Sequence, residues 1–412
     1  MKTLRVVYAG WGERWLLGTL ADDGRRILFE YSDEARRAGL ELSPLRLPLA
    51  HPGAFTGEPF FMGLPGLVAD ALPDGWGLLL MDRAFRRAGR APEQVSPLDR
   101  LAFIGERAMG ALIFEPAEPL ALPDENLALL RLAEDAAQVL SGASGEADAT
   151  LRRLLLLGGS PQGARPKVLV DFDQTRRRIA SGGQHDGMAP WLVKFPGGGE
   201  HRDACAIEEL HARLARHCGI DMPESRFFAL DGRHAAFGVR RFDREGGRRA
   251  PLLSLSAALH VDYRLPALDY ETLLRATRRL TGDEREVVKA FERCVFNVLA
   301  HNRDDHARNF AFRLDRERRW RLAPAFDLTF SPGPGGEHHT TVAGEGRAPG
   351  REHLLELARR SGVPLPAAQA GIDRILEGMS AFEALAQDLP IRKTRLAELR
   401  RVLAEDNRRV RQ

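Results

Sequence analysis

The sequence has little cysteine, no long apolar run and almost no net charge. Its 412 residues include three cysteines, Cys205, Cys218 and Cys294, and no pair of them has the spacing of a metal-binding motif. This excludes a disulfide-stabilised secreted fold and a cysteine-ligated metal centre, so we expect buried, reduced thiols. No segment approaches the roughly 18 apolar residues that are needed to cross a bilayer, and no membrane association is expected.

The charge balance excludes a strongly basic nucleic-acid-binding protein. There are 60 basic and 57 acidic residues, for a net charge of +3, which is only weak support for an acidic partner such as a nucleotide. A hydrophobic content of 44% is that of a globular protein, and the length allows two or three domains. The first eight residues alternate as a strand does and do not resemble a signal peptide, so a cytoplasmic location is expected.

The first part of the chain predicts a small mixed domain. Residues 4–9 and 14–20 alternate around Gly10–Gly12 as a hairpin, and residues 26–31 add a third strand. Helices are expected over about 78–88 and 97–103, and a strand over 110–114. Three prolines between residues 116 and 124 indicate a linker. We therefore place a domain boundary near residue 119, giving domains 1–119 and 120–412.

The second domain changes character along its length. Residues 150–244 are predicted to form strands with one helix, over 204–218. Residues 245–412 are mostly helical, and residues 331–350, rich in Gly, Pro and His, are expected to form a mobile loop. A β-rich small lobe followed by a helical lobe predicts an α+β, protein-kinase-like bilobal fold. The expected helices cover about 270–280, 284–299, 351–361, 367–386 and 392–409.

One polar segment stands between a helical and a strand-like run. In residues 301–309, Asp304 is followed five positions later by Asn309, and Asp327 ends an apolar segment downstream. A carboxylate that takes a hydroxyl proton, with an amide and a second carboxylate that hold Mg²⁺, is the constellation of phosphoryl transfer in protein kinases. The alternative is a hydrogen-bonded turn rich in Asn and Asp.

Two further segments fit a nucleotide-binding small lobe. Small residues over 158–167 allow backbone N–H groups to approach a phosphate, but taken alone this Gly-rich segment is weak evidence, and a surface turn is the alternative. Lys194 interrupts an apolar strand, where it would either contact phosphates or mark an edge strand that points to water. Glu208 or Glu209, in the next helix, could pair with Lys194 or form a solvated face.

Other polar residues allow both functional and structural interpretations. Phe242 follows a strand where backbone groups could contact adenine, whereas Asp243 is expected to form a surface salt bridge. His306 could position phosphate or substrate, or be a hydrogen-bonded structural histidine. His338 and His339 offer too few ligands for a metal site.

Together these segments resemble the HipA family, the Ser/Thr kinase toxins of bacterial type II toxin–antitoxin modules. The likeness runs over nearly the whole chain, and the residues before 119 resemble the N-terminal domain of that family. The most specific segment is Asn302–Phe310 with the downstream Phe326–Asp327. The other segments that carry the resemblance are 160–167, 191–196, 239–244 and 322–328, with 55–57 and 72–75 in the N-terminal part.

The resemblance implies a role for each matching position. Asp304 becomes the catalytic base, and Asn309 and Asp327 become the Mg²⁺ ligands. ATP is expected to contact a set of residues from both lobes, namely Gly163, Ala164, Lys167, Lys194, Arg240, Phe242 and His306.

Ser160 matches the serine that such kinases phosphorylate on themselves, which ejects the Gly-rich loop and inactivates the enzyme. A phosphate there would add about −1.5 to −2 charges and repel ATP phosphates. The loop departs from the family pattern at two positions. Arg165 stands where Gln is common, and Pro161 follows Ser160.

The function implied is an ATP- and Mg²⁺-dependent protein serine/threonine kinase that acts as a toxin. Its target would be a cellular protein, for instance an aminoacyl-tRNA synthetase. The implied partner is a small helix-turn-helix antitoxin of HipB type, through which any DNA contact would be indirect. A small-molecule kinase on the same fold and a non-catalytic nucleotide-binding corepressor of such an antitoxin remain as alternatives.

Overall fold

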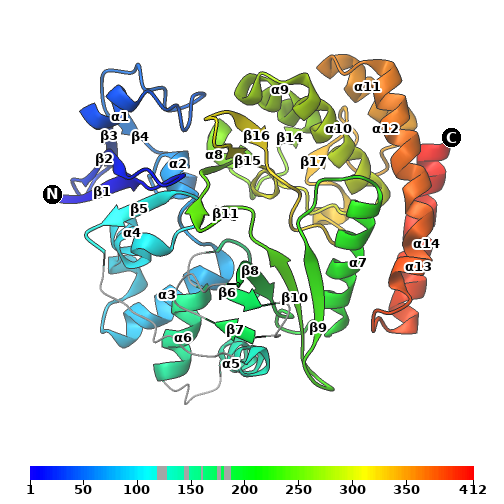
Figure 1. The fold of residues 1–412 in the computed structure, drawn as a ribbon, viewed down its shortest axis with the longest axis horizontal. Coiled ribbons are helices and arrows are strands. Elements are labelled where there is room, and N and C mark those ends of the chain that lie inside the picture. The colour runs from blue at the N-terminus through cyan, green and yellow to red at the C-terminus, as the bar shows by residue number, and fades with distance from the viewer. Residues whose placement is uncertain (118–127, 143–147, 159–160, 174–177, 181–186) are drawn as a thin grey trace. The chain divides into compact units, whose positions relative to one another are not determined.

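A computed structural model describes the whole chain except residues 118–127, 143–147, 159–160, 174–177 and 181–186 (Figure 1). The chain divides into two compact units. The first contains Met1–Cys205 and Arg226–Leu253, and the second contains Ala206–Ser225 and Ser254–Gln412. The domain boundary expected near residue 119 falls outside the described residues and stays a prediction.

The first unit begins with an antiparallel sheet in the order β4-β3-β2-β1-β5. The predicted hairpin and third strand are confirmed, because β1 pairs with β2 and β2 pairs with β3. Buried Leu4 and Val6 alternate with exposed Thr3 and Arg5 in the middle of β1, as in a half-buried strand, whereas Val6–Tyr8 at its end are all buried. The strands are β1 (Lys2–Tyr8), β2 (Trp15–Asp22), β3 (Ile27–Tyr31), β4 (Phe55–Thr56) and β5 (Leu112–Glu115).

The helices of the same unit lie between and after these strands along the chain. Ser96 and Asp99 form a reciprocal capping box that starts α4. The two helices predicted near 78–88 and 97–103 are confirmed as α3 and α4. The helices of this unit are α1 (Asp33–Ala38), α2 (Gly66–Ala69), α3 (Gly75–Arg87), α4 (Pro97–Ile104), α5 (Leu129–Ser141) and α6 (Asp148–Gly158).

A second five-stranded sheet has the order β7-β6-β8-β10-β9. The apolar strand that carries Lys194 is β8, and it lies between β6 and β10. The edge-strand interpretation of Lys194 is therefore wrong. The strands are β6 (Lys167–Asp173), β7 (Arg178–Ala180), β8 (Ala189–Lys194), β9 (Ser225–Ala229) and β10 (Ala235–Arg240).

Asp243 corrects another expectation, since it is buried and not at the surface. Its carboxylate pairs with Arg241 at 2.8 Å and Arg244 at 2.6 Å, and accepts the backbone N–H of Gly110 at 2.9 Å. These charge-assisted bonds explain why the pKa of Asp243, which burial alone would raise, is held well below its usual value. Asp243 thereby fastens the chain after β10 to the N-terminal sheet region. Two short strands, β11 (Arg244–Glu245) and β12 (Arg248–Arg249), follow it.

The second unit is mainly helical, as predicted. The central helix α10 packs against α9, α12 and α14 (Figure 1), and its C-terminal half is buried all round. The expected helix over 367–386 is divided into α12 and α13 by a 3-10 turn. The helices are α7 (Asp203–His217), α8 (Leu255–Leu259), α9 (Tyr270–Thr281), α10 (Glu284–Leu299), α11 (Arg351–Ser361), α12 (Leu365–Gly378), α13 (Phe382–Ala386) and α14 (Lys393–Arg411).

Short strands complete this unit. β15 (Ala311–Leu314) and β16 (Trp320–Leu322) form an antiparallel hairpin, and β14 (Leu268–Asp269) pairs in parallel with β17 (Thr340–Thr341). A further short strand, β13 (Leu252–Ser254), leads into α8. The three cysteines, all within the described residues, are buried free thiols, as expected.

Candidate active site

The predicted catalytic segment begins where α10 ends. His301 adopts a left-handed backbone with φ of 51°, which turns the chain out of the helix, and a 3-10 turn over Ala307–Asn309 leads on to β15. Between these two features, 55% of the Asp304 side chain is exposed, while Asp305 is buried. Neighbouring carboxylates thus point into different surroundings, one toward solvent and one into the protein.

Asp305 is the anchor of the segment. Its Oδ2 accepts hydrogen bonds from the Tyr270 hydroxyl at 2.7 Å and from His338 Nδ1 at 2.8 Å. Its Oδ1 accepts the backbone N–H of His339 at 2.8 Å and that of Thr340 at 3.2 Å. A buried carboxylate with four donors is held in one position, so the backbone beside Asp304 is fixed.

The network continues into α10. Asn297 Nδ2 donates to the Tyr270 hydroxyl at 2.8 Å, and Asn302 Nδ2 donates to Asn297 Oδ1 at 3.0 Å. Burial, together with the neighbouring Asp305, raises the pKa of Tyr270 well above its ordinary value, so its hydroxyl remains a donor. The chain through these side chains joins α9, α10 and the catalytic segment.

Arg303 holds the segment on its other side. Its guanidinium donates to the carbonyl oxygen of Gly336, and to that of Arg347 at 2.9 Å. The backbone N–H groups of Arg303 and His339 bind the carbonyl oxygens of Ser331 and Arg303, respectively. The segment expected to be a mobile loop over 331–350 is therefore fastened to residues 301–305 through many bonds.

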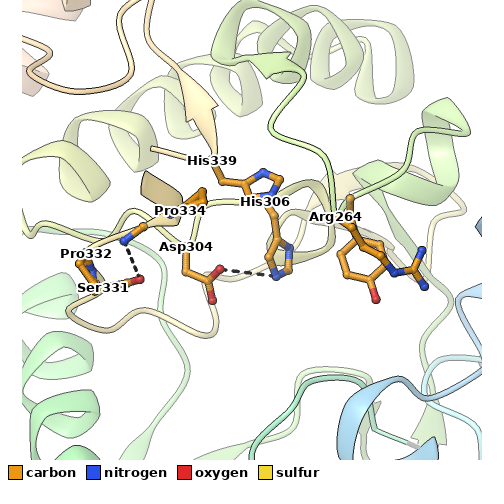
Figure 2. Close-up of a pocket in the computed structure, with 9 residues that line it drawn as sticks. Arg264, Asp304, His306, Ser331, Pro332, Pro334 and His339 are labelled. Carbon is orange, nitrogen blue, oxygen red and sulfur yellow. Dashed lines mark hydrogen bonds and ion pairs between the residues drawn. The ribbon is translucent and has the colours of Figure 1, made fainter. Parts of the chain in front are cut away.

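A recess of about 370 Å³ opens beside Asp304 (Figure 2). The carboxylate points toward His306, whose Nε2 lies 3.9 Å from Asp304 Oδ1. The His306 and His339 rings meet edge to face at 5.7 Å. His306 Nδ1 is buried and has no hydrogen-bond partner among the described residues. The remaining lining residues are Tyr263, Arg264, Ser331, Pro332, Gly333 and Pro334.

The surroundings of Asp304 make it a better base than an ordinary aspartate. Its pKa is raised, chiefly because the protein withdraws water from the carboxylate, and the negative charge of Asp327 acts in the same direction. His306 and His339 oppose this by favouring the charged form. Because part of the side chain stays in solvent, the carboxylate remains reachable by a hydroxyl group that enters the recess.

Asn309 and Asp327 are the two residues that the resemblance implies as Mg²⁺ ligands, and this role stays a prediction. The Asn309 amide nitrogen donates to the carbonyl oxygen of Asp304 at 2.7 Å, which leaves its amide oxygen for a ligand. Asp327 has a left-handed backbone with φ of 56°, a conformation that costs energy outside glycine and concentrates at functional sites. No group of three His, Cys, Asp or Glu side chains that could hold a metal ion occurs within the described residues. Two oxygen donors fit Mg²⁺, which keeps several waters.

The segment before Asp327 is anchored to α10. Glu286 Oε2 accepts the backbone N–H of Leu322 at 3.0 Å, and Arg293 Nη2 donates to the carbonyl oxygen of Ala323 at 2.8 Å. Both side chains are buried. The same helix therefore positions the start of the catalytic segment and the approach to Asp327.

In the first unit, Lys167 and Lys194 lie directly opposite each other on β6 and β8. Both are buried, with 3% and 6% exposure, and their side chains point to the same face of the sheet because they are paired across neighbouring strands. Lys194 Nζ lies 5.8 Å from the centre of the Phe237 ring. Two buried cations on one face attract an anion such as a phosphate.

The Gly-rich loop leads into Lys167. Gly163 has φ of 103°, which only glycine adopts readily, and Ala164 follows it. The Lys167 ammonium donates to the carbonyl oxygen of Gln162, so the loop folds back over the start of β6. Ser160 lies outside the described residues, and its self-phosphorylation stays a prediction.

Arg240 and Phe242 come at the end of β10, where Arg240 is paired with Trp191 of β8. The chain continues alongside β8, since the Arg241 N–H donates to the carbonyl oxygen of Pro190 at 2.9 Å. The two residues are thus placed next to the strand that carries Lys194. Of the suggested glutamates, Glu209 bonds Arg213 at 2.8 Å and Ser225 at 2.7 Å.

The chain matches models of two protein families. The HipA N-terminal domain family matches residues 9–115, and the HipA-like C-terminal domain family matches residues 159–383. The chain belongs to the HipA family. A search of curated proteins finds no significant match.

A solved HipA structure agrees with this HipA-family assignment at the level of fold. HipA of Shewanella oneidensis MR-1, from a toxin–antitoxin complex with HipB and operator DNA, superposes with a TM-score of 0.73 at 17% identity. That match covers 99% of this chain and 97% of the other. The Helicobacter pylori proinflammatory kinase CtkA gives a TM-score of 0.41 at 14% identity, over 56% of this chain and 90% of its own. The predicted fold class, kinase-like with an N-terminal α+β domain, is confirmed.

Several residues of the HipA-family site escaped the sequence analysis. Tyr270, Asn297, His338 and Asp305 form its buried support, yet only Asp305 lies in the motif. One signal was present, because Asn297 is a polar residue within the apolar face of the helix over 284–299.

None of the described helices is long and apolar enough to span a membrane.

Proposed function

We propose that this HipA-family chain is an ATP- and Mg²⁺-dependent serine/threonine protein kinase. The observation that carries the proposal is Asp304, a carboxylate with a raised pKa that stands in an accessible recess. Asn309 is bonded to its backbone. This arrangement supports the transfer of a phosphoryl group to a hydroxyl.

In this mechanism Asp304 accepts the proton of the substrate hydroxyl. Asp305 and Arg303 hold the backbone on either side of it, so the carboxylate needs little reorganisation. Asn309 and Asp327 would hold Mg²⁺ through oxygen atoms. Lys167 and Lys194 would bind phosphate oxygens, with the loop at Gly163 and Ala164 above them. Bound ATP supplies the phosphoryl group.

Partners and regulation follow from the family. HipA of Shewanella was solved with HipB and operator DNA, which supports a helix-turn-helix antitoxin as partner here, with DNA contacted through it. We further propose a cellular protein as substrate, such as an aminoacyl-tRNA synthetase, inactivation by phosphorylation of Ser160, and action in the bacterial cytoplasm.

The test is phosphate transfer by the purified chain. With labelled ATP and Mg²⁺, alone and with a bacterial extract, label should appear on protein and should vanish in Asp304→Asn but persist in Asp373→Asn, an exposed aspartate on α12. Loss of self-labelling in Ser160→Ala would place the regulatory serine. Consumption of ATP without protein labelling would favour a small-molecule kinase, and binding without consumption would favour a corepressor.

A further inference from the structure

Residues 74–76 of the N-terminal domain form two hydrogen bonds with Gly163 of the Gly-rich loop. The backbone N–H of Gly163 donates to the carboxylate of Asp74, and its carbonyl oxygen accepts the backbone N–H of Trp76 at 3.1 Å. Both backbone hydrogen-bonding groups of Gly163 are therefore engaged by residues 74–76. All of these residues belong to the first unit.

The side chain of Asp74 makes this contact and, in the described part of the chain, does not cap its own helix, α3. It occupies the N-cap position of α3, where an aspartate normally binds the first backbone N–H groups of its own helix. Here its side chain makes no such capping bond among the described residues. The carboxylate is directed at the Gly-rich loop instead, so this contact takes the place of a stabilising helix cap.

The approach of the two backbones is close enough to require glycine. Gly75 has φ of 40°, and a Cβ at this position would lie 2.6 Å from Ala164 Cα. A second tie lies beside it, because Gln162 Nε2 donates to the carbonyl oxygen of Asp70 at 2.9 Å. The loop is held from one side over Gln162–Ala164.

We propose that Asp74 is a positioning residue for the nucleotide, through which the N-terminal domain holds the Gly-rich loop in its ATP-binding shape. The inference rests on the proposed function in one respect, that this loop binds ATP. By engaging both backbone groups of Gly163, residues 74–76 fix the orientation of the neighbouring peptide groups and of Lys167. The N-terminal domain is then a working part of the ATP site.

The test is the dissociation constant for ATP, measured by calorimetry on the full chain. Asp74→Ala removes the acceptor and should weaken ATP binding by about fivefold to tenfold, the loss expected for one part-buried hydrogen bond. Asp74→Asn keeps an acceptor oxygen and should bind ATP as the wild type does. Gly75→Ala, which pushes on Ala164, should weaken binding as Asp74→Ala does.

The control is Asp23→Ala, which removes a carboxylate that accepts backbone N–H groups in the turn between β2 and β3 and should leave ATP binding unchanged. Melting temperatures identify any variant that is simply unfolded. Where transfer is measurable, Asp74→Ala should raise KM for ATP and leave kcat nearly unchanged.

Unchanged ATP affinity in folded Asp74→Ala would overturn the inference. Tighter binding in both Asp74 variants would also overturn it, since it would make the carboxylate a competitor of phosphate. If the wild type binds no ATP, the proposed function itself fails, which is a separate result. The comparison of variants therefore distinguishes the two failures.

Discussion

At the scale of single residues, the catalytic segment separates two adjacent aspartates by what surrounds them. Asp304 faces an open recess, and its pKa is raised chiefly by burial, with the negative charge of Asp327 acting in the same direction. Asp305 faces the interior and accepts hydrogen bonds from two parts of the chain, Tyr270 of α9 and residues 338–340. We expect substitution of Asp304 to reduce phosphoryl transfer and substitution of Asp305 to reduce stability.

The first prediction concerns Asp304→Asn. It should reduce phosphoryl transfer by about 10²–10⁴-fold, the usual contribution of a general base. The variant should melt at or slightly above the wild-type temperature at neutral pH. When the pKa of a carboxyl group is raised in the folded state, the folded protein becomes less stable as pH rises through that pKa, because the group becomes charged. An uncharged amide at this position removes that destabilisation. Transfer assays and thermal melts check both parts, and a folded variant with wild-type transfer would contradict the assignment.

The second prediction concerns Asp305→Ala, which should act mainly on stability. It leaves His338, the Tyr270 hydroxyl and two backbone N–H groups without their acceptor. We expect a loss of about 2–4 kcal/mol in the free energy of unfolding, on the scale of buried unsatisfied donors. Urea denaturation measures it, with Asp373→Asn on the exposed face of α12 as the control. A loss below that of the control would show that the network does not hold the segment.

At the scale of secondary-structure elements, the β6–β8 pair concentrates positive charge. Lys167 and Lys194 are cross-strand neighbours inside the sheet, where like charges repel. A phosphate group would add a counter-charge at this position. Under the proposed function, this sheet would bind the phosphates of the nucleotide.

The third prediction follows for Lys194→Met. ATP at 100 times its dissociation constant should stabilise the wild type by about 2.7 kcal/mol, and most of this gain should disappear in the variant. Thermal melts with and without ATP measure it, and Lys289→Met, a half-exposed lysine on α10, serves as the control. An equal ATP-dependent shift in both variants would exclude Lys194 from the site.

The fourth prediction concerns the cluster around Asp243. Asp243→Ala should cost about 3–5 kcal/mol, because it leaves the part-buried Arg241 and Arg244 without their carboxylate partner. The folded pKa of Asp243 is lowered, so its contribution is present above the unfolded value of about 4 and is lost as pH falls below it. Denaturation at pH 7 and near pH 3 should show the variant losing less stability on acidification than the wild type. Asp33→Ala, at an exposed helix start, is the control.

At the scale of the whole molecule, the sequence predicts the helices, the strands and the motif around Asp304. It does not predict the long-range contacts that hold them in place. The hairpin of β1 and β2 and the helices α9, α10 and α14 follow from periodicity, which is a local property. Lys194 was open to an edge-strand reading because strand order depends on contacts distant in sequence. The sequence alone predicts a surface position for Asp243, because its partner Gly110 lies far away along the chain.

The same limit applies to the site. The Asp304, Asn309 and Asp327 spacing is readable because it is short. The bonds from Asp305 to Tyr270 and His338 are not readable, since they join residues 35 and 33 positions apart. Asp74 and Gly163, 89 positions apart, were both present in recognised segments, yet nothing in the sequence showed that they meet.

The four bonds to Asp305 have a dynamic consequence. The amide hydrogens of His339 and Thr340 are held by the residue next to the base, so they can exchange with solvent only when the 331–347 segment releases that carboxylate. Their exchange rates should therefore report how often the arrangement around Asp304 comes apart. The exchange rates of these two amide hydrogens thus measure the lifetime of the conformation around Asp304.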